Sequence, residues 1–516
     1  MPLRPMAALR DALAVLLLVA TPALAETVVV AVPADPEHFN PGITTGSHTH
    51  AVANSLFNGL VARDRDNRPV PDLATGWEIS EDGRSYSFTL AEARWHDGEP
   101  VTSEDVRVTF ERVLLPHHAR TGASLAGRLE AIETPDARTV VFRLAAPYAP
   151  ILQQLDVTEA PILPAHLFAE GDARDNPANL APVGSGPFRF VRHLRDDVVE
   201  LERNPDYFKP DLPRIDRLVF RILPDARTAL LAFQAGEVDV LRSLGGADAR
   251  VLESRADTTI EAVSSGPGGG NCVMTLVFNL DRPTLQEPRL RAAIAHATDR
   301  ERMVADILFG RGRVAAAPIA SGIPWAHAPE ALAAYPLDRG RAAELLDAAG
   351  LAPGPDGHRL SLDIVHFPAF QRYADALRQD LAAVGIELTS RPLDRAGTVE
   401  AIFLQRDFDT GLISYCHGLD PEIGFRRTLA SDAIGPVPFS NGAGFSDPEV
   451  DALFARAVET VELDARGAIY AEIQAIAARE LPYWWLVETE SLSAHRADLD
   501  GFAMWSGQFA EGAGRR

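Results

Sequence analysis

Residues 414–421, with the sequence SYCHGLDP, carry the side chains best suited to hold a ligand. They follow an apolar segment, residues 408–415, which predicts a strand of a parallel sheet, and loops at the carboxyl ends of such strands commonly bind ligands. His417 offers a ring nitrogen and Asp420 a carboxylate, although an aspartate directly before Pro421 is also typical of a turn. A single histidine does not make a metal site, so we predict no metal.

Two arginines, Arg426 and Arg427, follow this loop. A guanidinium group binds a carboxylate through two parallel hydrogen bonds, so Arg426 predicts a ligand that carries a carboxylate. The alternative is that both arginines are surface or structural residues.

Aromatic and imidazole side chains complete the candidate binding site. Trp325 lies in a predicted loop, Tyr415 offers a flat ring, and His48 and His50 lie in a polar loop that we expect to face a cleft. Binding sites combine such amphipathic walls with a few polar anchors. A buried position in the core is the alternative for each of these residues.

Motifs for catalysis and cofactor binding do not occur in the sequence. It contains no GxSxG, HExxH, CxxC or GxxxxGK[ST]. The adjacent His117 and His118 cannot share one helical face, which favours a solvated pair over a metal site. We therefore predict a protein that is not an enzyme and that needs no cofactor.

The elements that must position these residues follow an α/β pattern. Residues 27–32 form an apolar run typical of a first strand. Asp225 and Gly236 mark the start and end of a helix over residues 226–235. Residues 360–389 read as strand, helix and strand, which predicts a βαβ unit and a parallel sheet.

Further helices follow from local signals. Residues 51–60 predict a helix early in the chain. Thr102 with Asp105 predicts a capping box for residues 103–114, and Thr298 with Glu301 predicts another for residues 299–309.

Four motifs, taken together and in order, resemble one known family. They are WHDGEPVTSEDV at residues 95–106, VGSGPFRF at 183–190, VELERNPDYF at 199–208 and FQAGEVDV at 233–240. Their sequences and spacing are similar to those of the family 5 solute-binding proteins of ABC importers, which include oligopeptide, dipeptide and nickel receptors. The resemblance extends over nearly all of the chain after residue 25.

The resemblance implies an α/β fold of the periplasmic binding protein type II kind, with two large lobes, a hinge and a small extra α/β domain. The ligand would lie in the cleft between the lobes, and the glycine-rich residues 264–271 would belong to the hinge. The implied boundaries are residues 26–65, 183–265 and 486–510 for lobe I, 66–182 for the small domain, and 266–485 for lobe II.

The resemblance also implies a function. The protein would be the periplasmic substrate-binding component of an ABC importer, a monomer that delivers a peptide or peptide-like solute to an inner-membrane permease. In peptide-binding relatives an acidic residue of the loop before Asp420 pairs with the amino group of the peptide, and His417 stands at that position here. This departure keeps open an opine-like or other carboxylate conjugate, an oligosaccharide or a nickel complex. A secreted hydrolase and a sensor subunit for a chemoreceptor are alternatives of other classes.

Charge and the N-terminus indicate where the protein works. Arg4 and Arg10, the apolar residues 12–20, and an A-x-A site before Glu26 predict a cleavable signal peptide over residues 1–25 and export to the periplasm. The alternative is a buried N-terminal helix. The net charge of -23 argues against nucleic acid as a partner.

The sequence has only two cysteines, Cys272 and Cys416. An oxidising compartment permits a disulfide bond between them. Two separate buried thiols are the alternative.

Overall fold

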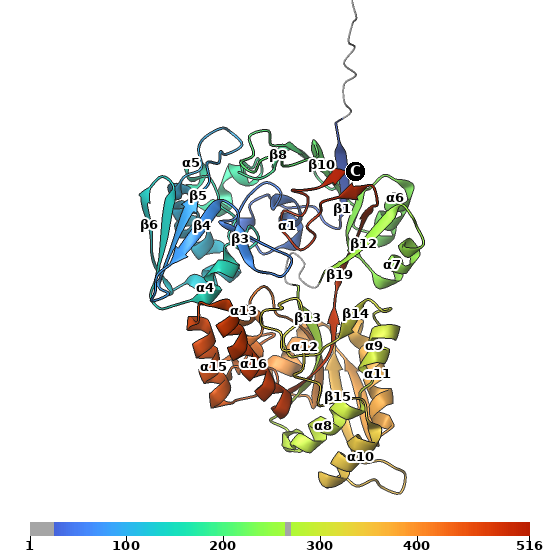
Figure 1. Cartoon of the computed structure of the whole chain (residues 1–516). Coiled ribbons are helices and arrows are strands. Elements are labelled where there is room, and N and C mark those ends of the chain that lie inside the picture. The colour runs from blue at the N-terminus through green and yellow to red at the C-terminus, as the bar shows by residue number, and fades with distance from the viewer. Residues whose placement is uncertain (1–24, 264–269) are drawn as a thin grey trace, which may run out of the picture.

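Two large β-sheets form the two lobes of the molecule. The computed structural model describes residues 25–263 and 270–516. Lobe I is built on a seven-stranded sheet and lobe II on a six-stranded sheet, and Figure 1 shows lobe I and a small domain side by side above lobe II. No helix in the described ranges is long and apolar enough to cross a membrane.

The sheet of lobe I is centred on β1, which lies parallel to both β10 and β11. Val28 and Val30 of β1 are fully buried in its core. The strands, in spatial order, are β12 (Thr258–Val263), β19 (Ser491–Arg496), β11 (Val240–Leu244), β1 (Thr27–Val32), β10 (Arg217–Ile222), β9 (Val198–Arg203) and β8 (Phe188–Leu194). Helices α1 (Ser47–Ala53), α6 (Ala226–Ala235) and α7 (Gly246–Glu253) belong to the same lobe.

The predicted caps of α6 are confirmed. The side chain of Asp225 accepts the backbone N–H of Thr228 at 2.7 Å, which satisfies one of the free donors at the start of the helix. Gly236 ends the helix with φ 84°, a left-handed conformation that glycine adopts without steric cost.

The sheet of lobe II is mixed rather than parallel. The predicted βαβ unit is confirmed, because β15 and β16 are parallel and are joined by α11. The strand that leads into residues 414–421, here called the candidate loop, is β17. It lies parallel to β15, as predicted, but antiparallel to β13, so the sheet is parallel only at β16, β15 and β17. The strands, in spatial order, are β14 (Gly312–Val314), β18 (Tyr483–Thr489), β13 (Cys272–Phe278), β17 (Thr410–Cys416), β15 (Leu360–His366) and β16 (Ile386–Pro392).

The helices of lobe II enclose a large hydrophobic core that includes the buried Trp484. They include α8 (Pro288–Ala297), α9 (Arg300–Asp306), α10 (Arg339–Ala348), α11 (Gln371–Ala382), α13 (Pro421–Gly424), α14 (Arg426–Leu429), α15 (Pro448–Glu459) and α16 (Leu463–Glu480). The predicted capping box at Thr298 is wrong by one residue, because Asp299 is the N-cap and accepts the N–H of Arg302 at 2.9 Å.

The small domain is a four-stranded antiparallel sheet covered by helices. Its strands, in spatial order, are β4 (Ala74–Ile79), β5 (Ser85–Leu90), β7 (Thr139–Leu144) and β6 (Leu129–Asp136), and its helices include α2 (Ser103–Val108) and α4 (Ala119–Leu125). The capping box of Thr102 and Asp105 is confirmed. Beyond α2 the predicted helix continues as a π-helical segment, Thr109–Leu114.

The motif at residues 183–190 packs against the backbone just after α1. The N–H of Gly186 donates to the carbonyl oxygen of Leu56 at 2.8 Å. A Cβ atom on Gly184 would lie 1.7 Å from that same oxygen, so no side chain fits there. The chain leaves helical geometry to make this contact, which explains why α1 ends at Ala53 and the helix predicted over residues 51–60 is wrong.

The chain crosses between the lobes at two neighbouring places. One crossing joins β12 to β13, and the other joins β18 to β19 through Glu490. Most of the predicted hinge, residues 264–269, lies outside the described residues, as do residues 1–24 of the predicted signal peptide.

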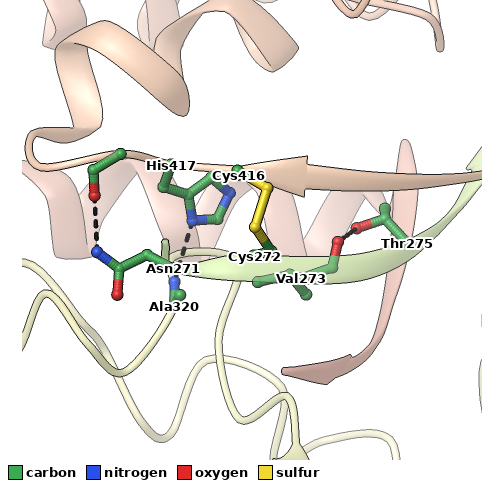
Figure 2. The surroundings of a disulfide bond; sticks show 8 residues. Asn271, Cys272, Val273, Thr275, Ala320, Cys416 and His417 are labelled. Atoms are coloured by element: carbon green, nitrogen blue, oxygen red, sulfur yellow. Dashed lines mark hydrogen bonds between the residues drawn. A yellow bond between two sulfur atoms is a disulfide. The ribbon is translucent and has the colours of Figure 1, made fainter. Parts of the chain in front are cut away.

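A disulfide bond between Cys272 and Cys416 settles the question that the sequence leaves open. The two residues lie opposite each other on β13 and β17, and Figure 2 shows the bond beside the start of the candidate loop. It therefore fastens the end of β17, from which the loop departs, to the neighbouring strand.

Candidate functional site

A cavity of about 570 Å³, here called the first cavity, opens at the carboxyl ends of the central strands of lobe I. Its wall includes residues 31–34 after β1, residues 242–244 of β11, and residues 490–493 where the chain enters from lobe II. His48, His50 and Arg120 also line it. Ligands of open α/β sheets bind at this edge, outside the carboxyl ends of parallel strands.

A second cavity, of about 290 Å³, lies between the small domain and lobe II. Arg120, Gln154 and Glu159 form one side of it, and residues 416–419 and Arg427 form the other. Arg120 also lines the first cavity, so this one side chain borders both. Its guanidinium is fixed by Glu159, with a closest N–O distance of 2.8 Å.

A chain of polar contacts holds lobe II close to the rest of the molecule at the second cavity. Arg63 pairs with the buried Asp156 at 2.8 Å and donates to the side-chain oxygen of Asn67, also at 2.8 Å. Asn67 in turn donates to the carbonyl oxygen of Leu419 at 2.8 Å. The candidate loop is therefore tied directly to residues from the other side of the cleft.

His417 lines the second cavity as a neutral ring. Its Nδ1 accepts the N–H of Ala320 at 3.1 Å, as Figure 2 shows, and its ring packs edge-on against Phe425. Burial, with a smaller contribution from the nearby Arg427, lowers the pKa of His417 to about 3. Because Nδ1 accepts a hydrogen bond, the proton of the neutral ring is on Nε2, which can act only as a donor.

Asp420 is a structural residue in this fold. It is fully buried and forms two hydrogen bonds with the guanidinium of the equally buried Arg466, at 2.5 and 2.7 Å. It also accepts the N–H of Glu422 at the start of α13. Asp420 lines neither cavity, and its carboxylate oxygens already have these partners. The carboxylate is therefore not available to a solute.

The two adjacent arginines point to different surroundings. Arg426 forms an ion pair with Asp432 at 2.6 Å and lies outside both cavities. Arg427 lines the second cavity, where its Nε donates to the carbonyl oxygen of Gly424 at 3.2 Å. The structure therefore presents the guanidinium of Arg427, rather than that of Arg426, to the cleft.

His48 and His50 both line the first cavity. His50 is held in place, with one ring nitrogen 3.1 Å from the side-chain oxygen of Asn54 and the other 3.0 Å from the carbonyl oxygen of Thr44. Burial lowers the pKa of His50, so its ring is neutral at pH 7. His48 is half-buried.

Trp325 and Tyr415 pack inside lobe II and line neither cavity. The ring of Trp325 lies against Tyr470 and the guanidinium of Arg466. Tyr415 is buried, packs edge-on against Tyr483, and donates its hydroxyl hydrogen to the carbonyl oxygen of Ser440.

With this geometry established, comparison with known proteins places the chain in a family. Residues 68–435 match the bacterial extracellular solute-binding proteins, family 5, middle region. The chain belongs to this family.

Relatives of this family 5 protein extend over much of its length. A Brucella ovis protein, provisionally named an ABC transporter peptide-binding protein, is 33% identical over 368 residues, which cover 69% of this chain and 66% of that protein. The glutathione-binding protein GsiB of Pectobacterium atrosepticum is 26% identical, over 93% of this chain and 91% of its own length.

The fold is likewise that of the family. The structure of HbpA2 from Haemophilus parasuis superposes with a TM-score of 0.84 at 23% identity, covering 95% of this chain and all of that one. The α/β architecture with two lobes and a small extra domain is therefore confirmed for this family 5 protein.

Three of the four arginines on the cavity walls, Arg63, Arg120 and Arg242, escape sequence reasoning in this family 5 protein. Arg63 lies at the end of β2 (Val61–Arg63), Arg120 on α4 and Arg242 on β11, and no local pattern links them. Only the doublet of Arg426 and Arg427 gives a signal in the sequence, and it does not indicate which of the two faces the cleft.

Proposed function

We propose that this protein is the periplasmic substrate-binding component of an ABC importer. It captures a peptide or peptide-like solute between its lobes and delivers it to an inner-membrane permease. The observation that carries the proposal is the second cavity, whose walls come from the small domain on one side and from lobe II on the other. A solute bound there contacts both sides of the cleft and stabilises the closed form relative to the open one.

The names of two relatives support a peptide-like solute. One is the provisionally named peptide-binding protein of Brucella ovis and the other is the glutathione-binding protein. We propose His48 and His50 in the first cavity and His417 in the second as residues that contact the solute. The protein would act as a monomer without a cofactor or a catalytic step, after cleavage of a signal peptide at residue 25.

Thermal unfolding tests this proposal. The protein is produced with its own N-terminus, recovered from the periplasmic fraction, and heated in the presence of di- to pentapeptides, opines, oligosaccharides, or nickel with a chelating acid. A ligand at one hundred times its dissociation constant adds about 2.7 kcal/mol to the free energy of unfolding, which raises the melting temperature measurably.

The variant Arg120→Gln should lose most of that shift, because Arg120 borders both cavities. Its control is Arg112→Gln, an exposed arginine of the same domain that lines neither cavity. If no class of solute shifts the melting temperature, or if the purified protein turns over a peptide or sugar, the proposal is wrong.

A further inference from the structure

Two arginines on the cavity walls have no carboxylate partner in the part of the chain that the structure describes. Arg242 lines the first cavity, donates to the carbonyl oxygen of Ala51 at 3.3 Å, and stacks 4.1 Å from the ring centroid of Phe509. Arg427 lines the second cavity, and its Nε donates to the carbonyl oxygen of Gly424 at 3.2 Å. Each cavity therefore presents one guanidinium group that has no ion pair.

The acidic residues on the same walls are already paired. Glu159 binds Arg120, and Glu490 binds Arg313. No other aspartate or glutamate is found among the described residues of the two walls. A solute with a free ammonium group would therefore meet no unpaired carboxylate in either cavity.

The protein environment leaves the charge of both arginines uncompensated. Burial lowers the pKa of Arg242 to about 10, whereas the side chain of Arg427 stays exposed at the second cavity. His50 and His417 are neutral, so neither adds to the positive charge of the arginines. A guanidinium that is desolvated without an anion is destabilised, and an arriving oxyanion relieves that cost. This positive charge faces the cleft of a chain whose net charge is -23.

We infer that the solute carries an oxyanion group at each of two ends, one bound by Arg242 in the first cavity and the other by Arg427 in the second, and that it needs no free amino group. Arg120 borders both cavities, which allows one molecule to extend past it from one arginine to the other. Carboxylate and phosphate groups both suit the two-point geometry of a guanidinium. The inference rests on the proposed function and narrows its solute class from peptides in general to anionic peptide-like conjugates.

Calorimetric titration with four matched probes tests the inference. N-succinyl-Ala-Ala has a carboxylate at both ends, and N-phosphonoacetyl-Ala-Ala replaces one of them with a phosphonate. Ala-Ala-Ala has one amino and one carboxylate end, and its amide has no carboxylate. We expect one or both of the first two probes to bind at least about tenfold more tightly than Ala-Ala-Ala, and the amide to bind weakest. The tighter of the two identifies the oxyanion as carboxylate or phosphate.

Variants then assign each end of the probe. Arg242→Gln and Arg427→Gln should each weaken binding of the better anionic probe by about thirtyfold, since each leaves one oxyanion unpaired. Arg250→Gln and Arg395→Gln are the controls, because these arginines also stack on phenylalanine rings but line neither cavity. Both controls should change the affinity by less than about twofold. Arg427 is exposed, so its variant keeps the fold even if the loss of Arg242 does not.

The outcomes separate the inference from the proposed function. Tighter binding of Ala-Ala-Ala than of both anionic probes, or equal effects of the wall and control variants, overturns the inference while the binding function stands. No binding of any of the four probes also overturns the inference, and the thermal unfolding panel then decides whether the binding function stands.

Discussion

The buried ion pair between Asp420 and Arg466 gives the sharpest test of how the candidate loop is built. Their side chains are 0% and 1% exposed and share two hydrogen bonds, of 2.5 and 2.7 Å. Asp420→Asn removes the negative charge and leaves the buried guanidinium without the carboxylate that is hydrogen-bonded to it. Removing one partner of such a pair typically costs about 3–5 kcal/mol. We expect about 3 kcal/mol, because the asparagine oxygen can still accept one hydrogen bond from Arg466.

Urea unfolding followed by tryptophan fluorescence measures this loss, since Trp325 lies against Arg466 and reports on lobe II. The control is Asp432→Asn, which breaks the exposed ion pair with Arg426 at 2.6 Å. An exposed pair contributes only about 0–1 kcal/mol. A loss below about 1 kcal/mol for Asp420→Asn would contradict a structural role for this pair, because a buried unpaired charge should destabilise the folded state by more than that.

Three other contacts lead to measurable expectations. Burial raises the pKa of Glu422 from 4.5 to about 7, so between these pH values the folded protein retains a proton that the unfolded chain releases. The free energy of unfolding therefore falls as the pH rises from about 4.5 to about 7. Glu422→Gln should remove this fall and add about 2 kcal/mol to the free energy of unfolding at pH 8, measured by urea titration. Replacing Cys272 and Cys416 with serine opens a link across 144 residues and should lower the free energy of unfolding by about 4 kcal/mol. Gly184→Ala should destabilise by at least about 3 kcal/mol in the same assay, whereas Gly76→Ala, with no atom within 4 Å of its Cβ, should be nearly neutral.

Each expectation has its own contradicting result. Burial lowers the pKa of His118 to about 3, so at low pH this histidine makes stability rise with pH, opposite to the effect of Glu422. The quantity to compare at each pH is therefore the difference in free energy of unfolding between Glu422→Gln and the wild type. A difference that does not change with pH would refute the assignment for Glu422. Unchanged unfolding of the serine variant, or equal stability of the two alanine variants, would refute the other two.

Local signals predicted much of the fold because they act within a few residues. Asp225 and Gly236 fix the ends of α6, and strand, helix and strand over residues 360–389 fix a parallel pair. The C-terminal end of α1 could not be predicted, since the chain just after it contacts Gly186 through Leu56, 130 positions apart in the sequence.

The site was less accessible to sequence reasoning because its parts meet only in the folded protein. Asp420 has its partner 46 positions away on α16, and nothing near Asp420 indicates that its carboxylate is occupied. In a helix as short as α14, side chains one residue apart point in directions about 100° apart, so only the structure distinguishes Arg426 from Arg427. The four arginines of the cavity walls come from four different elements, and no local sequence pattern indicates that these elements meet.

The measurement that decides most directly whether this protein serves an importer needs no guess about its solute. A strain that lacks the gene and its parent are grown in the same rich medium, and the small molecules left in the medium are compared by mass spectrometry. We expect the deletion strain to leave behind at least one anionic peptide-like solute that the parent removes. Uptake should return with the wild-type gene but not with the Arg242→Gln/Arg427→Gln variant. Identical depletion by the parent and the deletion strain would contradict the importer function.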